Sequence, residues 1–278
     1  GLSFPQAVAV DSTRHVIFVT SRDNDRVYKL DGNTLAVLGS VVVPDQPWGI
    51  AYYAAGDKVY VGSWAAGSVT VLNASNLAVV KTISVGPNPT WVIAGGSRIR
   101  LIAYGGNALV TINPQTDLVE RYYRLARSNG AWALAYNPTL DLTYVSSRDS
   151  KTITVIDAGF VERTVIAAGR SAACEPFQMD FNPTLNRLYS VCDVEGQRND
   201  QVIVYQPSGV NLSAVAEVTV GSAGTDTPGG EDGRGGLAVN PATGSVFVSN
   251  ADDNTVSVID GNRNIRIATF TVGSDPFG

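Results

Sequence analysis

Three short stretches of this 278-residue chain repeat one pattern: AGSVTVLN at 66–73, SKTITVID at 150–157 and DNTVSVID at 253–260. In each stretch a small polar turn leads into residues that alternate between apolar and polar side chains. Alternation with a period of two is typical of a β-strand, and no segment of the chain shows sustained helical periodicity. A turn and strand that recur at separated positions predict an architecture built from repeats.

A second motif sets the length of the repeat. It precedes an apolar strand and begins at residues 5 (PQAVAV), 47 (PWGIAY), 89 (PTWVIA), 131 (AWALAY), 176 (PFQMDF) and 234 (RGGLAV), so its spacings are 42, 42, 42, 45 and 58 residues. Each repeat contains four candidate strands, separated by turn sequences such as NPTL at 137–140 and DGNR at 260–263. Four strands in about 42 residues predict one blade of a β-propeller.

The sequence therefore predicts an all-β fold, a six-bladed β-propeller with four antiparallel strands per blade and blades contiguous in sequence. Residues 1–278 are expected to form a single propeller domain, because stacking twisted sheets face to face buries surfaces that one sheet cannot bury alone. The expected blades are approximately 3–46, 47–88, 89–130, 131–175, 176–233 and 234–278.

The phrases VYVGS (59–63), TYVSS (143–147), TISVGPNPTW (82–91) and VFVSNADDNTVSVID (246–260) resemble the YVTN family of β-propeller repeats, which is related to the NHL type. The resemblance covers essentially the whole chain and is specific for the fold, but such propellers serve many roles. Members of the family often have seven blades. The final DPFG (275–278) is then either the start of a seventh blade or a segment that closes the ring against the first strand.

Composition narrows the functional classes. The chain has 20 basic and 25 acidic residues, a net charge of −5, and 44% hydrophobic residues. Mild acidity argues against nucleic acid as a partner, and no apolar run approaches the ~20 residues that span a bilayer. The richness in Thr, Ser, Val and Gly, with little Lys, resembles exported β proteins. We expect an extracellular, periplasmic or cell-surface location, with the propeller forming all or part of a surface protein.

One face of the expected propeller carries the irregular loops. In a four-stranded antiparallel blade, the turn between strands 2 and 3 and the connection from strand 4 to the next blade share one end, here called the top face. The fifth repeat has its extra length in CDVEGQRND (192–200) and in the glycine-rich 221–235 segment. The second segment is either a binding element or flexible filler.

Aromatic and charged residues also gather at the expected top face, and we predict that they bind a ligand. Their ring faces could stack on a sugar, an aromatic group or a peptide, although tryptophan also commonly packs between sheets. SRD occurs at 21–23 and 147–149, which suggests either a polar collar or ordinary solvated turns. The predicted ligand-binding residues are Trp48, Trp64, Trp91, Trp132, Tyr104, Phe177, Arg22, Arg148 and Asp149.

The two cysteines, Cys174 and Cys192, fall on neighbouring strands of the fifth repeat near the top face. A disulfide is expected, and two free thiols are the alternative. The single histidine, His15, lies near a turn at the opposite end, where it is unsuited to a catalytic triad.

Cofactor signals are weak. We expect none, except that calcium could bind in the glycine-rich segment, and its candidate ligands are Asp226, Glu231 and Asp232. Lactonase-like propellers hold a central calcium through acidic and amide side chains on inner strands, and here only Asp180 occupies such a position.

We therefore expect a non-catalytic, exported binding or scaffold propeller that engages a protein, peptide or glycan through its top face. The alternative is a metal-dependent, lactonase-like hydrolase with its site at the axial channel. A third reading is a spacer within a longer surface protein, with no ligand of its own.

Overall fold

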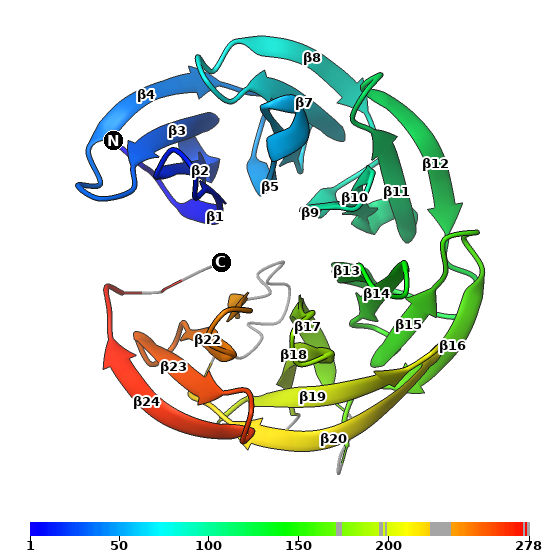
Figure 1. Cartoon of the computed structure of the whole chain (residues 1–278). Coiled ribbons are helices and arrows are strands. Elements are labelled where there is room, and N and C mark those ends of the chain that lie inside the picture. Colours follow the sequence, from blue (N-terminus) through cyan, green and yellow to red (C-terminus); the bar gives the residue numbers. More distant parts are fainter. Residues whose placement is uncertain (171–173, 195–196, 198, 223–234, 275, 277–278) are drawn as a thin grey trace. The chain divides into compact units, whose positions relative to one another are not determined.

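The structure is a computed structural model that describes residues 1–170, 174–194, 197, 199–222, 235–274 and 276. The described residues form six four-stranded antiparallel sheets, and each sheet consists of four strands that are consecutive in sequence (Figure 1). Apart from three short 3-10 turns, the described regular structure is all β. The chain is thus a six-bladed all-β propeller, which confirms the fold predicted from the repeats.

The chain divides into two compact units, unit 1 (residues 1–125) and unit 2 (residues 126–278). That residues 1–278 form a single propeller domain stays a prediction. The sheets of unit 1 are formed by β1 (Pro5–Asp11), β2 (Val16–Ser21), β3 (Arg26–Asp31) and β4 (Val37–Val42); β5 (Pro47–Tyr53), β6 (Lys58–Ser63), β7 (Ser68–Asn73) and β8 (Val79–Ser84); and β9 (Pro89–Gly95), β10 (Arg98–Ala103), β11 (Ala108–Asn113) and β12 (Leu118–Arg124).

Unit 2 contains the other three sheets, which span the longer repeats. They are formed by β13 (Ala131–Asn137), β14 (Leu142–Ser147), β15 (Thr152–Ile156) and β16 (Glu162–Ala167); β17 (Glu175–Asn182), β18 (Arg187–Asp193), β19 (Gln201–Ser208) and β20 (Asn211–Thr219); and β21 (Leu237–Asn240), β22 (Ser245–Asn250), β23 (Thr255–Asp260) and β24 (Ile265–Thr271). The 3-10 turns, η1 (Arg22–Asn24), η2 (Ala54–Gly56) and η3 (Tyr104–Gly106), all lie in unit 1.

Asp and Asn residues at the ends of the first and third strands shape the turns. In the β13–β14 turn, Asn137 Oδ1 accepts hydrogen bonds from the backbone N–H of Thr139 (3.0 Å) and Leu140 (3.2 Å). This side chain replaces a backbone acceptor and allows a tight reversal. The same two-residue and three-residue reach recurs at Asp11, Asp31, Asn73, Asn182, Asn240 and Asp260.

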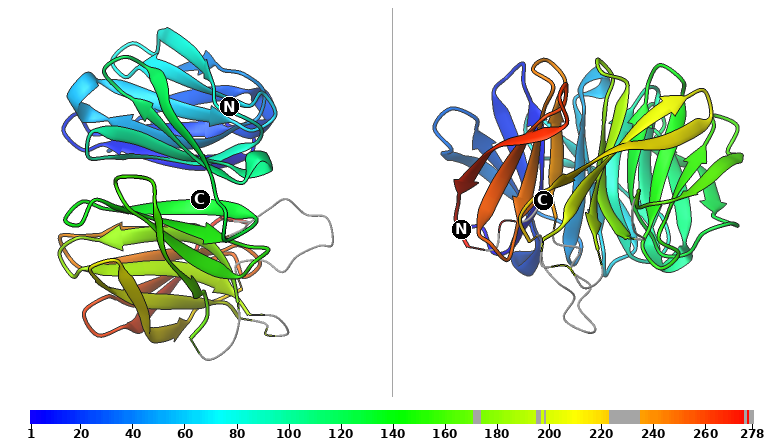
Figure 2. Two further views of the ribbon diagram at one scale, coloured as in Figure 1. Left: turned by 90° about the vertical axis from the view of Figure 1, so that its right-hand side faces the viewer. Right: turned by 90° about the horizontal axis from the view of Figure 1, so that it is seen from below.

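Burial falls from the inner strands to the outer strand of each blade. All residues of the third strand β7 are buried except its last, whereas its outer neighbour β8 is mostly exposed, with Val79 and Val80 both 51% exposed. A blade sandwiched between two others must bury both faces, so a strand with an alternating sequence becomes buried on both sides. Each sheet also has the usual strand twist (Figure 2).

Neighbouring blades within a unit pack through their first strands. In unit 1, β5 contacts both β1 and β9, and in unit 2, β17 contacts both β13 and β21 (Figure 1). Gly49 shows how close this approach is, because a Cβ atom there would lie 2.2 Å from the backbone oxygen of Thr90 on the next blade. Only glycine fits at this position without moving the neighbouring strand.

Candidate functional site

Among the described strands, the first strand carries a β-bulge near its start in five of the six blades. In four of them, pairing with the second strand skips two residues between Pro5 and Val8, Pro47 and Ile50, Ala131 and Leu134, and Pro176 and Met179. A bulge adds residues on one strand and redirects their side chains. The first skipped residue is aromatic in three of these blades, where it is Trp48, Trp132 or Phe177. In the first blade it is Gln6. The bulge therefore positions the predicted aromatic side chains.

A buried hydroxyl group holds the bulge in two blades. Thr20 Oγ1 accepts from the N–H of Ala7 at 3.0 Å and donates to the carbonyl oxygen of Trp48 on the next blade at 2.8 Å. Ser146 repeats the arrangement in unit 2, since its Oγ accepts from Ala133 N–H at 3.0 Å and donates to Phe177 O at 2.8 Å. One hydroxyl thus satisfies the bulged backbone and links it to the neighbouring first strand.

In unit 1, planar side chains from three blades form a row, here called the unit-1 row: Phe4, Arg22, Trp48, Trp64 and Tyr104. The Arg22 guanidinium lies 5.5 Å from the Phe4 ring centroid and 5.4 Å from that of Trp48. The row continues from Trp48 to Trp64 at 5.1 Å and from Trp64 to Tyr104 at 5.7 Å. Such separations are typical of cation–π and aromatic contacts.

In unit 2, Arg148 occupies the same place in its blade and forms a sandwich, here called the unit-2 stack. Its guanidinium carbon lies 4.9 Å from the Trp132 ring centroid and 4.7 Å from that of Phe177 on the next blade. The Arg148 side chain also pairs with Glu175 at 3.6 Å. Two aromatic rings and one carboxylate hold this guanidinium in a defined plane.

The predicted disulfide is confirmed and lies beside the unit-2 stack. Cys174 and Cys192 are bonded, their Cα atoms are 5.5 Å apart, and both side chains are fully buried. Cys174 precedes β17, and Cys192 pairs with Pro176 near the start of that strand. The bond therefore fixes the chain leading into the Phe177 bulge to the second strand of the same blade.

The structure brings most of the predicted ligand-binding residues together within each unit, but it buries the large rings. Trp48 and Trp132 are each 1% exposed, and Trp64, Trp91 and Phe177 are at most 8% exposed. Arg22, Tyr104 and Arg148 are partly exposed, and Asp149 is exposed. A ligand at these surfaces would meet the arginines, Tyr104 and Asp149 before it met an indole.

Trp91 differs from Trp48 in its place within the bulge, although the bulge of β9 follows Pro89 as that of β5 follows Pro47. The skipped residues there are Thr90 and Trp91, so Trp91 is the second of the pair rather than the first. Among the described residues, no ring contact joins Trp91 to the unit-1 row. The prediction that it shares a surface with Trp48 stays a prediction.

The candidate metal ligands give no assembled site. Asp226, Glu231 and Asp232 lie outside the described residues. Within the part of the chain that the structure describes, no three His, Cys, Asp or Glu side chains are grouped to hold a metal ion. His15 lies exposed in the β1–β2 turn.

Asp180, the acidic residue expected at a lactonase-like position, is committed to the backbone. Its Oδ2 accepts from Val239 N–H and its Oδ1 from Phe181 N–H, both at 2.8 Å. Gln178 on the same strand accepts from Leu237 N–H at 3.0 Å, so β17 side chains pair with the backbone of β21. Burial raises the pKa of Asp180 to about 6, against the lowering effect of the two hydrogen bonds.

Sequence reasoning missed Phe4, Thr20 and Ser146. A signal for the hydroxyls was present, because TSRD (20–23) and SSRD (146–149) place Thr or Ser two residues before each stacked arginine. Phe4 also immediately precedes the proline that starts β1. These local patterns repeat, but their meaning depends on a partner in the next blade.

Comparison with known proteins supports the fold. No family model and no curated protein matches this chain. Among solved structures, it is similar to Kuenenia stuttgartiensis hydrazine synthase, with a TM-score of 0.81 and 17% sequence identity over 99% of this chain and 88% of that one. Among the described residues, no helix is long and apolar enough to cross a membrane. At this identity the likeness establishes a shared six-bladed β-propeller fold.

Proposed function

We propose that this chain is a non-catalytic binding propeller that engages a protein, peptide or glycan through the top faces of its units. A propeller of this kind supports a binding or scaffold role in general. The ligand class is our inference from the surface chemistry of the unit-1 row and the unit-2 stack.

The observation that carries the proposal is the repeated stacking of an arginine at the end of a second strand. Arg22 lies between Phe4 and Trp48, and Arg148 lies between Trp132 and Phe177. A guanidinium held flat between rings keeps its N–H groups at the edges of its plane, where they suit carboxylate or carbonyl oxygens. Because the rings already restrict the side chain, less conformational entropy is lost when a ligand binds.

The exposed groups nearby fit a polar, oxygen-rich partner. Tyr104 is partly exposed at the end of the unit-1 row, and exposed Asp149 follows Arg148. Arginine and tyrosine are enriched where proteins contact other proteins, and both also suit glycan hydroxyls. We favour such a partner over an apolar small molecule, since the indoles themselves are buried.

We further propose that the protein is exported. The buried Cys174–Cys192 disulfide supports this, because disulfides persist in oxidising compartments. The YVTN-like repeat phrases are compatible with a surface protein of that family type, and the propeller would then be one part of a surface architecture.

Binding can be tested on immobilised glycan and peptide arrays with the whole chain and two variants, Arg22→Gln and Arg148→Gln. We expect each to weaken at least some wild-type interactions tenfold or more. Arg266→Gln, at an exposed arginine on β24, is the matched control and should bind like the wild type. Equal binding by all four proteins would contradict the proposal. Turnover on a panel of lactones and esters, with metal in the purified protein, would favour the lactonase-like alternative.

A further inference from the structure

Three cationic side chains make the same contact with the next blade. Lys58 Nζ donates to Pro114 O at 2.9 Å, Lys29 Nζ donates to Ala74 O at 3.0 Å, and Arg187 donates to Gly261 O. Each acceptor is the first residue after a third strand, β11, β7 or β23. We call these contacts the latches, because each joins one blade to the turn that follows the third strand of the next blade.

The latches differ in the turn residue that lies three positions after the carbonyl acceptor. Asp117 accepts from Lys58 at 2.6 Å, and Asn264 accepts from Arg187 at 2.9 Å. The corresponding residue in the Lys29 latch is Leu77, whose side chain cannot accept a hydrogen bond. All three turn residues have positive φ, 52°, 54° and 62°, so the turn backbone is alike. The cations come from different strands, because Lys58 and Arg187 begin the second strands β6 and β18, whereas Lys29 lies on the third strand β3.

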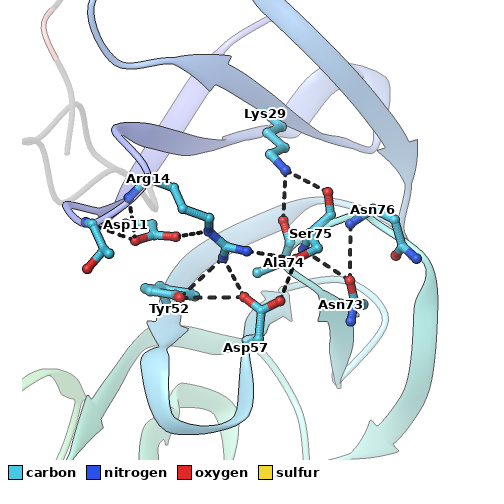
Figure 3. A network of polar contacts seen from close by, with 10 residues as sticks. Asp11, Arg14, Lys29, Tyr52, Asp57, Asn73, Ala74, Ser75 and Asn76 are labelled. Carbon is cyan, nitrogen blue, oxygen red and sulfur yellow. Dashed lines mark hydrogen bonds and ion pairs between the residues drawn. The ribbon is translucent and has the colours of Figure 1, made fainter.

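Lys29 consequently lacks the side-chain acceptor that the other two latches have. Its acceptors among the described residues are two carbonyl oxygens, Ala74 O and Ser75 O, the latter at 2.7 Å. An ammonium has three N–H donors, so one remains. The nearby carboxylates of Asp11 and Asp57 are paired with Arg14, as Figure 3 shows. Burial, reinforced by the Arg14 charge, lowers the pKa of Lys29 against the raising effect of the Asp57 and Asp11 carboxylates.

A cavity of about 260 Å³ that is open to solvent is lined in part by Lys29. Its polar lining comes from Lys29, Ser40, Ser75 and Asn76, and its apolar walls from Leu38 and Leu77. Asn76 Oδ1 already accepts from Ala78 N–H at 2.9 Å, and Ser40 Oγ already accepts from Arg26 at 2.9 Å. The Asn76 amide N–H groups and the Ser40 hydroxyl proton therefore add donors to the one that Lys29 retains.

We propose that this cavity binds a small organic carboxylate, whose oxygens take the place beside Lys29 that Asp117 takes beside Lys58. A lining with an excess of donors selects an acceptor-rich anion, and the two leucines favour a carbon skeleton over an inorganic ion. The volume accommodates a hydroxy acid or a sugar acid. The site lies at the end of unit 1 opposite its top face, so it is independent of the binding role proposed above.

Titration calorimetry of the whole chain with glucuronate, glucose and sulfate tests the proposal. We expect saturable binding of glucuronate, none of glucose, and weaker binding of sulfate. Lys29→Gln should weaken glucuronate binding at least tenfold, because the ammonium is lost. Lys81→Gln, which changes the net charge equally on β8 of the same unit, should leave it unchanged.

A second variant copies the side-chain acceptor that the neighbouring blade has at Asp117. Leu77→Asp should abolish glucuronate binding by supplying an internal carboxylate, as Asp117 does in the next blade. Asn76→Ala, at an exposed residue, tests the site with little risk to folding and should also weaken binding. Absence of saturable glucuronate binding, or equal losses in Lys29→Gln and Lys81→Gln, would overturn the proposal. Sulfate binding as tight as that of glucuronate would overturn its organic part.

Discussion

The two units use different side chains to pack the ends of their second strands against the neighbouring bulges. At the residue that follows the second strand, unit 1 has Arg22, Trp64 and Tyr104, whereas unit 2 has Arg148, Val194 and Ala251. In unit 1 planar groups continue across three blades, but in unit 2 one sandwich ends beside a disulfide. At this position a guanidinium in blades 1 and 4, and an indole in blade 2, packs against the ring of a neighbouring bulge.

The largest expected effect comes from emptying the centre of the unit-1 row. Trp48→Ala should destabilise the protein by about 3–5 kcal/mol, because it removes a fully buried indole and leaves a cavity. Urea unfolding followed by circular dichroism would measure the loss. Tyr122→Ala, at a 47% exposed ring in the same unit, is the control and should cost far less. Similar costs for both variants would mean that the row contributes little to packing.

In unit 2 the disulfide is expected to supply part of the stability that ring contacts supply in unit 1. Reduction should lower the free energy of unfolding by about 3 kcal/mol, given the 18-residue separation of the cysteines. The mass should rise by two hydrogen atoms, and the Cys174→Ser/Cys192→Ser variant should match the reduced protein in urea. Alkylation of both cysteines in native, unreduced protein would contradict the bond.

Asp180 makes the stability of unit 2 depend on pH in a way that unit 1 does not share. Its pKa is raised to about 6 in the folded state, against 3.8 for the free group, so the folded state binds the proton more tightly. This contribution is fully present below pH 3.8 and is lost as the pH rises through 6, at a cost of about 3 kcal/mol.

Asp180→Asn should abolish that pH dependence. The amide oxygen can still accept one backbone hydrogen bond, from Val239 or Phe181, while the charge is gone. Urea unfolding of both proteins between pH 3.5 and 7 gives the comparison. If the variant keeps the wild-type pH profile over that range, Asp180 is not its source.

The smallest expected effect tests the equivalence of guanidinium and indole directly. Arg22→Trp puts in blade 1 the residue that blade 2 has at Trp64, and we expect stability to change by less than about 1 kcal/mol. Arg22→Ala removes the planar group and should cost more, since two ring contacts are lost. Thermal unfolding of the two variants ranks them, and a greater loss for Arg22→Trp would show that the charge itself is needed.

Much of the fold was predictable because its signals are local. Alternation within a strand, an Asn or Asp at the turn and a repeat near 42 residues are all visible in the chain, and they led to six blades of four strands. The pairing of Cys174 with Cys192 followed from their places on adjacent strands of one blade. The candidate site was predictable only as a group of residues, since the burial of Trp48 and Trp132 depends on the neighbouring blade.

By itself, the sequence determined the number of blades, the strand order within each blade and the end at which the arginines and aromatic residues lie. Tertiary structure decided what those residues do. It placed Arg22 and Arg148 between rings, withdrew the indoles from solvent, and left Lys29 opposite Leu77 where Lys58 meets Asp117. The physical reason is distance along the chain. Strand and turn preferences act over a few residues, whereas each of these contacts joins blades whose sequences begin about 42 residues apart.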